Sequence, residues 1–407
     1  MNVPKLRFKN AEGADFPLWT ISKLGNEVQF SKGGKLGKSD LQKEGSHQCL
    51  LYGELYTSYG SIASKIFSRT DTDSDTTSQK YDVVMPTSGE TAEDIATATC
   101  IPFDGILYGG DLIILRSQTL YGPFLSYQIN SSLKRKISRV AQGKSVVHIG
   151  AEKIKPISFS FPCLEEQQKI ASFFSTLDQK IELNERKVEA LEKLKKGLMQ
   201  NIFNRKIRFK KDDGTDFPDW KVSELGNIAE IRGGGTPSTS NSDYWDGNIQ
   251  WLTPTEIDSK YVHESNRKIT ESGLANSSAK LLPMGTILLT TRATLGACSI
   301  NNFNGFVCTN QGFQSLVCKP IVLNEYVYYA ITSDEFQKKI TKHASGSTFL
   351  EISAKNLKKL TIPTPSLEEQ RKIADLLSTL DLQIDIKKKT VSAMRDLKRG
   401  FMQQMFI

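Results

Sequence analysis

The chain has 407 residues, of which 38% are hydrophobic and 24% charged, and it carries a net charge of +8 with an isoelectric point near 9.0. This length is too great for one ordinary core and suits two to four domains. The sequence holds no apolar run of the roughly 18 to 20 residues that span a membrane and no signal-peptide core, so we expect a cytoplasmic protein. The basic charge permits binding to a polyanion without requiring it.

Three segments of the first half return in the second half in the same order. The opening segment "RFKNAEGADFPLWTISKLGN" (residues 7–26) recurs as "RFKKDDGTDFPDWKVSELGN" (208–227), and "GKSVVHIGAEKIKPISFSFP" (143–162) shares its pattern with "GSTFLEISAKNLKKLTIPTP" (346–365). "LEEQQKIASFFSTLD" (164–178) matches "LEEQRKIADLLSTLD" at 11 of 15 positions, 203 residues further on. Each half therefore consists of an opening segment, a middle, a strand that stops at proline, and a long helix.

The two middles, residues 27–142 and 228–345, have nearly equal lengths of 116 and 118 residues but barely align. Strand-like segments such as "GDLIILR" and "GTILLTTR" alternate with loops rich in Gly, Ser and Thr, which predicts α/β or α+β domains with mixed, irregular sheets. Shared frames around unlike middles indicate one scaffold that carries two different readers. The alternative is a duplicated domain whose middles drifted apart.

Each half ends in a segment with apolar residues at steps of three and four, which predicts a helix of about forty residues and roughly 60 Å. Ser366 and Glu369 have the spacing of a capping box, in which the glutamate side chain reaches back to the serine amide, whereas Cys163 replaces the serine in the first copy. The predicted seam residues are Ile170, Phe174, Leu177, Ile181, Val188, Leu191, Leu194 and Leu198 in the first helix, and Ile373, Leu377, Leu380, Ile384, Val391, Met394, Leu397 and Phe401 in the second.

One such helix cannot bury its stripe alone, and a domain of about 115 residues is too small to cover a helix of some 60 Å. We therefore expect the two helices to pack as an antiparallel coiled coil, with Asn184 and Lys387 at matching seam positions that fix the register. The predicted architecture is pseudo-twofold symmetric. It has a first globular domain (1–162), a central helix (163–207), a second globular domain (208–365) and a C-terminal helix (366–407).

The sequence offers little support for an enzyme that acts alone. In "GGKLGKS" (33–39) the first glycine of a P-loop is replaced by Lys32, and the matching "RGGGTPSTS" (232–240) has no lysine, so we interpret both as loops whose amides and lysines meet phosphates. Neither H-E-x-x-H, G-x-S-x-G nor the [DN]-P-P-[YF] methyltransferase motif is present, and the four histidines are scattered. The six cysteines form no C-x-x-C pair, so we expect buried thiols rather than a metal site.

The twin "P-x-LEEQ-x-KIA…STLD" helices, the twin "G-x-DFP-x-W…LGN" openings and "GGGTPSTSNSDYWDGNIQWLTPTEI" (233–257) resemble the specificity subunit of type I restriction-modification enzymes over essentially the whole chain. The "FPCLEEQ" junction departs from the family pattern only in its cysteine. The resemblance implies that each middle is a target recognition domain, which reads one half of a bipartite sequence in double-stranded DNA. The helices would set the spacing and dock two modification subunits.

The same resemblance implies that the chemistry belongs to the partners. Two modification subunits would bind S-adenosylmethionine and methylate adenine, and two restriction subunits would use ATP and Mg²⁺ for translocation and cleavage. No cofactor and no catalytic residue is expected in this chain. Two other functions stay open: a coiled-coil adaptor that binds proteins through two globular heads, and a self-sufficient methyltransferase, which the missing motif disfavours.

Residue types in the loops predict which side chains contact DNA. Arginine offers a bidentate fork to guanine, serine and threonine suit phosphates or bases, and lysine suits phosphates, although an exposed lysine can also be a solvated surface charge. The predicted contacts are Arg232, Thr236, Ser238, Arg292 and Thr294 in the second half and, at the matching places of the first half, Lys32, Lys35, Lys38, Ser88 and Glu90.

Overall fold

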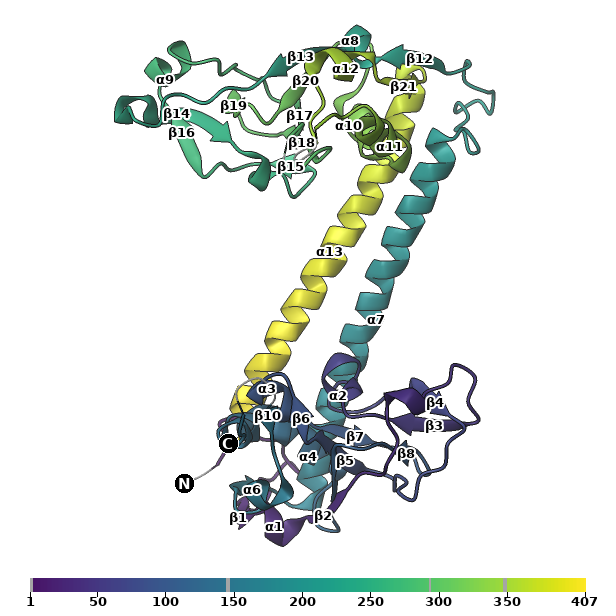
Figure 1. Cartoon of the computed structure of the whole chain (residues 1–407), viewed down its shortest axis with the longest axis vertical. Coiled ribbons are helices and arrows are strands. Elements are labelled where there is room, and N and C mark those ends of the chain that lie inside the picture. The colour runs from purple at the N-terminus through teal and green to yellow at the C-terminus, as the bar shows by residue number, and fades with distance from the viewer. Residues whose placement is uncertain (1–2, 144–146, 293, 347–349) are drawn as a thin grey trace. The chain divides into compact units, whose positions relative to one another are not determined.

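The computed structural model divides the chain into two compact units, each with a globular α/β domain (Figure 1). It describes residues 3–143, 147–292, 294–346 and 350–407. Unit 1 comprises Met1–Arg186 with Lys388–Ile407, and unit 2 comprises Lys187–Lys387. Two long helices, α7 (Leu164–Phe203) and α13 (Leu367–Met405), lie within the predicted helical segments, and each contributes one half to each unit.

Unit 1 is built on two small sheets. The first is antiparallel in the order β2 (Gln29–Lys32), β9 (Leu112–Arg116), β5 (Asp82–Pro86) and β7 (Thr99–Ile101). In the second, β3 (His47–Leu50) pairs antiparallel with β4 (Ser68–Thr70) and parallel with β8 (Leu107–Tyr108). Two short pairs complete the sheets: β1 (Thr20–Lys23) with β11 (Ser158–Phe161), and β6 (Ser88–Gly89) with β10 (Val147–His148).

The helices of unit 1 before α7 are short. A π-helical turn (Ile129–Leu133) joins α4 to α5, and a 3₁₀ turn (Lys38–Asp40) follows the glycine-rich loop. The α-helices are α1 (Leu24–Glu27), α2 (Glu54–Thr57), α3 (Ala92–Ile95), α4 (Gly122–Gln128), α5 (Lys134–Ser138) and α6 (Ala151–Ile154).

Unit 2 repeats this arrangement. Its main sheet has the order β13 (Ala229–Gly233), β20 (Gln314–Cys318), β17 (Ile287–Leu289), β18 (Cys298–Asn301) and β15 (Tyr261–Val262), the last pair being parallel. The second sheet contains β16 (Arg267–Ile269), β14 (Trp245–Leu252) and β19 (Val307–Thr309), and β12 (Lys221–Glu224) pairs with β21 (Thr361–Thr364). Because antiparallel and parallel pairs occur in both units, the predicted mixed α/β class is confirmed.

The helical elements of unit 2 also lie between and beside the strands. Two 3₁₀ turns, Ser242–Tyr244 and Pro254–Glu256, flank β14. The α-helices before α13 are α8 (Leu225–Ile228), α9 (Glu271–Ala275), α10 (Asn324–Thr332), α11 (Asp334–Lys342) and α12 (Ala354–Lys359).

The central strands are apolar on both faces because the sheet lies between two cores. In β5, Val83 and Met85 pack into the cluster that includes the helices α4 and α5, whereas Val84 packs against the second sheet with Tyr108. Side chains alternate across a strand, so a strand covered on both sides reads as a continuous apolar run. In β17, Leu288 likewise belongs to a different cluster from its two neighbours.

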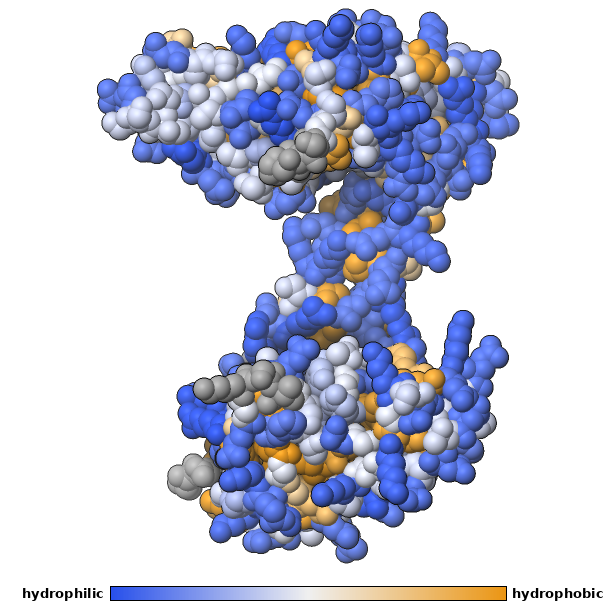
Figure 2. Space-filling model, viewed as in Figure 1, coloured by the Kyte–Doolittle hydropathy of each residue, from blue (hydrophilic) through white to orange (hydrophobic). Residues whose placement is uncertain are grey.

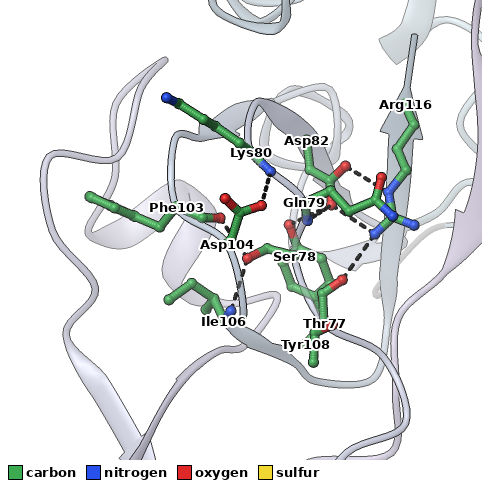
Figure 3. Close-up of polar contacts among 10 residues, drawn as sticks. All are labelled: Thr77, Ser78, Gln79, Lys80, Asp82, Phe103, Asp104, Ile106, Tyr108 and Arg116. Carbon is green, nitrogen blue, oxygen red and sulfur yellow. Dashed lines mark hydrogen bonds and ion pairs between the residues drawn. The ribbon is translucent and has the colours of Figure 1, made fainter. Parts of the chain in front are cut away.

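A partly buried ion pair lies at one end of the strand pair β5 and β9 (Figure 3). Asp82 accepts hydrogen bonds from Nε (2.7 Å) and Nη2 (3.0 Å) of Arg116 and from the hydroxyl of Tyr108 (3.2 Å). Burial beside this carboxylate raises the pKa of the Tyr108 phenol, so it stays a donor. At the other end of the same strand pair Pro86 stands opposite Leu112, and the loops of the candidate site begin there.

A buried glutamate at the start of each long helix holds the opening segment of its unit. Glu166 accepts hydrogen bonds from Nε (2.9 Å) and Nη2 (2.6 Å) of Arg7, and Glu369 accepts them from Nε (3.3 Å) and Nη2 (3.0 Å) of Arg208. Ser366 Oγ accepts from the amide of Glu369 at 3.3 Å, so the serine half of the predicted capping box is confirmed. The other half is wrong, because the Glu369 carboxylate faces Arg208 instead of the serine amide.

The indoles beside these glutamates differ between the units. Trp220 Nε1 donates to Glu369 at 2.8 Å, whereas the buried Nε1 of the equivalent Trp19 has no partner among the described residues. A hydrogen bond to a charged group contributes roughly 1.5 to 3 kcal/mol. We expect Trp220→Phe to lower the free energy of unfolding by about that much more than Trp19→Phe, which removes the same ring volume and no bond. Urea unfolding of both variants checks this, and equal losses would contradict it.

The two long helices pack antiparallel within each unit. In unit 1, Lys398 of α13 binds Asp178 of α7 at 2.5 Å, and Arg395 binds Glu185 at 2.6 Å, so the numbering runs in opposite directions along the two helices. In unit 2 the equivalent pair is Lys195 with Asp381, also at 2.5 Å. The predicted antiparallel packing is confirmed, and the ion pairs recur at the offset of 203 residues found in the sequence.

In each unit, one tyrosine of the globular domain donates a hydrogen bond to the aspartate of the ion pair between the long helices. The hydroxyl of Tyr127 donates to Asp178 at 2.7 Å, and that of Tyr329 donates to Asp381 at 2.5 Å.

The predicted seam between the two long helices is wrong at two places, since Leu194 and Leu397 are 50% and 52% exposed. At these places the residue that faces the other helix is the next one, Lys195 or Lys398. An α-helix has 3.6 residues per turn, so a stripe with a repeat of seven residues drifts gradually around the helix axis.

The next features are the polarity of the surface and the burial of the thiols. Figure 2 shows hydrophilic residues over most of the visible face of each unit. Within the described ranges, no helix is long and apolar enough to cross a membrane, and no group of three metal-ligating side chains forms a metal site. Contrary to prediction Cys163 is exposed and Cys318 only half-buried, whereas the buried thiols are those of Cys49, Cys100, Cys298 and Cys308.

Candidate nucleic-acid interface

The glycine-rich loop of unit 2 lies against the end of β19. A Cβ atom on Gly234 would stand 1.9 Å from the carbonyl oxygen of Asn310, and one on Gly235 would stand 2.3 Å from Ser278 Oγ. The amide of Gly235 donates to the carbonyl of Thr309 at 2.8 Å. These glycines are therefore required for the close approach of two backbones, and the Gly235 amide is engaged inside the unit.

Arg232, at the end of β13, and the loop after that strand make contacts along the same edge of the unit, which we call the rim. Nε and Nη2 of Arg232 bind the carboxylate of Glu230 at 2.9 and 2.8 Å, and Nη1 donates to the carbonyl of Leu281 at 3.0 Å. Thr236 Oγ1 donates to Gln311 Oε1 at 2.6 Å, and the exposed Ser238 hydroxyl lies 2.9 Å from that of Ser240. The Arg232 fork is thus already paired, while Thr236 and Ser238 lie at the surface.

The loop after β17 reaches the same place. The amide of Thr291 donates to the carbonyl of Gly312 at 2.7 Å, next to the glutamine that Thr236 contacts. Arg292 follows, with Nε 2.8 Å from an oxygen of Glu351, and the two side chains are 50% and 41% exposed. The hydrogen bond to Glu351 raises the pKa of the Arg292 guanidinium, which therefore stays charged. Thr294 is exposed beyond it.

Unit 1 repeats the rim with other side chains. A Cβ atom on Gly33 would stand 2.1 Å from the carbonyl of Gly109, and the amide of Gly110 donates to Leu36 at 2.9 Å. The amide of Thr87 donates to Asp111 at 2.8 Å, and Ser88 Oγ follows. The charged side chains predicted to contact DNA are all exposed, namely Lys32, Lys35, Lys38 and Glu90.

The structure adds one residue per unit that the sequence reasoning missed. Ser88 Oγ lies 3.0 Å from Nδ1 of His148, and Arg292 pairs with Glu351, the residue 203 positions after His148. The only sequence signal was the weak alignment of "KSVVH" with "STFLE", which assigned neither residue a role. His148 and Ser88 line a shallow pocket of about 530 Å³, together with Thr87, Asp111, Val140, Gln142, Ile149, Gly150 and Lys153.

The rim can therefore do two things chemically. Exposed lysines present positive charge to phosphates, and hydroxyl, imidazole and guanidinium groups present donors with the geometry of base edges. Such an arrangement suits recognition of a polyanion with a sequence of donors and acceptors.

Comparison with known proteins places this chain in a family. The family model described as the type I restriction modification DNA specificity domain matches the chain twice, at residues 18–193 and 218–393. The MjaIX specificity subunit of Methanocaldococcus jannaschii is 37% identical over 209 residues, which are 50% of this chain and 48%, about half, of that protein. The MjaVIII specificity subunit of the same organism is 24% identical over 421 residues, covering 97% of this chain and 94% of that protein.

Solved structures agree in fold. The crystal structure of a type I restriction-modification system S subunit from M. genitalium superposes with a TM-score of 0.64 at 18% identity, covering 100% of this chain and 99% of that one. Because the family model matches both halves and together most of the chain, this protein belongs to the family of type I restriction-modification DNA specificity subunits.

Proposed function

We propose that this chain selects the DNA sequence on which a type I restriction-modification complex acts, and that each unit reads one half of a bipartite target. The observation that carries the proposal is the repeated rim. Both units bring the glycine-rich loop, the end of the central strand and the last loop together through backbone bonds. The bonds of the strand end and the last loop are equivalent in the two units, yet the side chains that they present differ. One scaffold with two sets of donors is what two unlike half-sites require.

The proposed DNA contacts are those of the rim. Lys32, Lys35 and Lys38 neutralise phosphates, and Glu90, which is exposed as well, is a further contact. Ser88, Arg292, Thr294, Thr236 and Ser238 face base edges or phosphates. Nε, Nη1 and Nη2 of Arg232 are all engaged in the structure, by Glu230 and by the carbonyl of Leu281. For Arg232 to bind DNA, its guanidinium therefore has to leave Glu230 or to contact Glu230 and DNA at the same time.

The partners are two modification subunits and two restriction subunits that dock on the long helices. Leu194 and Leu397 occupy equivalent positions on α7 and α13 and are half exposed, so each helix offers the same apolar side chain to a partner. Equal surfaces suit two copies of one protein. The chain itself carries out no chemistry: S-adenosylmethionine, ATP and Mg²⁺ are held by the partners.

Salt dependence of DNA binding tests the proposal against a protein adaptor with two heads. For the complex assembled with modification subunits, the logarithm of the binding constant for duplex DNA should fall linearly with the logarithm of the salt concentration. The magnitude of that slope should decrease by about 0.9 for each phosphate contact removed. Replacing Lys32, Lys35 and Lys38 together by alanine is therefore expected to reduce the slope by roughly 2 to 3. The matched control is Lys193→Ala, an exposed lysine of α7, which should leave the slope unchanged. Duplex binding that is absent or independent of salt would favour the adaptor.

A further inference from the structure

The residue pairs 88/148 and 292/351 are held together by the same backbone frame. The amide of His148 donates to the carbonyl of Gln142 at 2.8 Å, and that of Glu351 donates to the carbonyl of Ser345 at 2.9 Å. The next residue binds each loop to the strand end. The amide of Ile149 donates to the carbonyl of Thr87 at 2.9 Å, and that of Ile352 donates to the carbonyl of Thr291 at 3.4 Å. The main chain therefore places positions 148 and 351 beside 88 and 292 whatever their side chains are.

The side chains at these positions differ in both size and charge. In unit 1, serine and histidine form a short pair and line the pocket of about 530 Å³. In unit 2 the pair is long and carries opposite charges, with both members about half exposed. An exposed ion pair of this kind adds little to stability, so the folded state does not account for a glutamate at position 351.

Glu351 also decides what Arg292 can bind. A carboxylate beside the guanidinium cancels the local positive charge, which weakens attraction to phosphates. It engages Nε and so fixes the plane of the guanidinium, whose Nη groups carry the remaining donors. A planar fork held in one orientation matches O6 and N7 of guanine in the major groove.

We propose that positions 148 and 351 complete a base-reading pair in each unit, resting on the function proposed above. Glu351 is a positioning residue that orients Arg292 toward a guanine of one half-site. His148 contacts a base of the other half-site directly, together with Ser88. The pair is a specificity-determining element because the frame is shared and only the side chains change.

The test measures the methylated motif of the complex assembled with modification subunits, by single-molecule sequencing of methylated DNA. Glu351→Ala and Arg292→Ala should each relax the same guanine position, with a loss of preference of about tenfold. The double variant should relax it no further than Arg292→Ala alone, because Glu351 acts through the arginine. His148→Ala should relax one position of the other half-site only. The control Glu335→Ala, an exposed glutamate of α11, should change neither half-site.

The unmutated half-site in each variant reports folding and assembly. If Glu351→Ala abolishes methylation altogether, Glu351→Asp, which keeps the carboxylate, gives the same comparison with a milder change. An unchanged guanine preference in the Glu351 variants, with Arg292→Ala still relaxing it, would overturn the positioning role and leave the proposed function standing. An unchanged motif in His148→Ala would overturn the pair in unit 1. A parent complex without any bipartite motif would instead overturn the proposed function.

Discussion

Replacing Arg208 with alanine is expected to lower the free energy of unfolding by about 3 to 5 kcal/mol, because it leaves a buried carboxylate without its charged partner. Glu369 has no exposed side-chain surface, and both its oxygens accept from Arg208. The indole of Trp220 is its other side-chain donor and cannot neutralise the charge. The opening segment of unit 2 should detach from α13 first, since Arg208 also donates to the carbonyls of Phe217 and Pro218.

Urea unfolding of the full chain measures this effect, and Arg232→Ala is the matched control. Arg232 is also paired with a glutamate, but that glutamate is exposed, so water replaces the lost partner and the change should be a small fraction of the first. Arg7→Ala should reproduce the large effect in unit 1, since Glu166 is buried to the same degree. Equal losses for Arg208→Ala and Arg232→Ala would show that burial of the carboxylate does not set the energy.

Lengthening both long helices by four residues is expected to widen the gap between the half-sites. One insertion is placed after Arg186 in α7 and the other after Lys387 in α13, where the two units meet in the sequence, so contacts within each unit stay intact. Four residues add about 6 Å and a net rotation of about 40°. That length is close to two base pairs at about 3.4 Å each, so the motif should keep both half-sites and gain roughly one or two base pairs between them.

A paired insertion of two residues is the control for helical phase. It adds about 3 Å but rotates the second unit relative to the first by about 200°, so the two readers no longer face the same groove and methylation should fall more than after the longer insertion. Methylation sequencing of both variants decides the matter. An unchanged gap in the four-residue variant would mean that the helices do not set the spacing.

The repeat made the long helices predictable, while side-chain partners distant in sequence were not. The "LEEQ" phrase recurs because its residues bind distant groups: Glu166 and Glu369 hold the arginines, and Gln167 and Gln370 accept from the amides of Tyr121 and Leu323. A local pattern suggested a capping box for Glu369, but a buried ion pair across 161 residues prevailed. Such a partner is not visible in local spacing.

In the candidate site, too, residue types were predictable from the sequence, whereas their partners distant in sequence were not. Residue type and position after a strand pointed to Arg292, and the structure places it at the surface. Its neighbour Glu351 lies 59 residues away, in a repeated segment whose pattern gave that residue no role. Arg232 has the same type and a similar place, but its fork is bound to Glu230 and Leu281. The glycine run was attributed to phosphate binding, and no feature of the sequence indicated that Gly33 and Gly234 each lie against a backbone carbonyl oxygen of the same unit.

If each unit reads its own half-site, exchanging one globular domain should change one half of the methylated motif, and this exchange is the most direct test. Residues 27–149, which include the loop that carries His148, are replaced by the corresponding segment of another family member, and the motif methylated by the assembled complex is sequenced. We expect one half-site to change to that of the donor protein, while the other half-site and the gap stay as they were. A change in both half-sites, or in neither, would contradict the account.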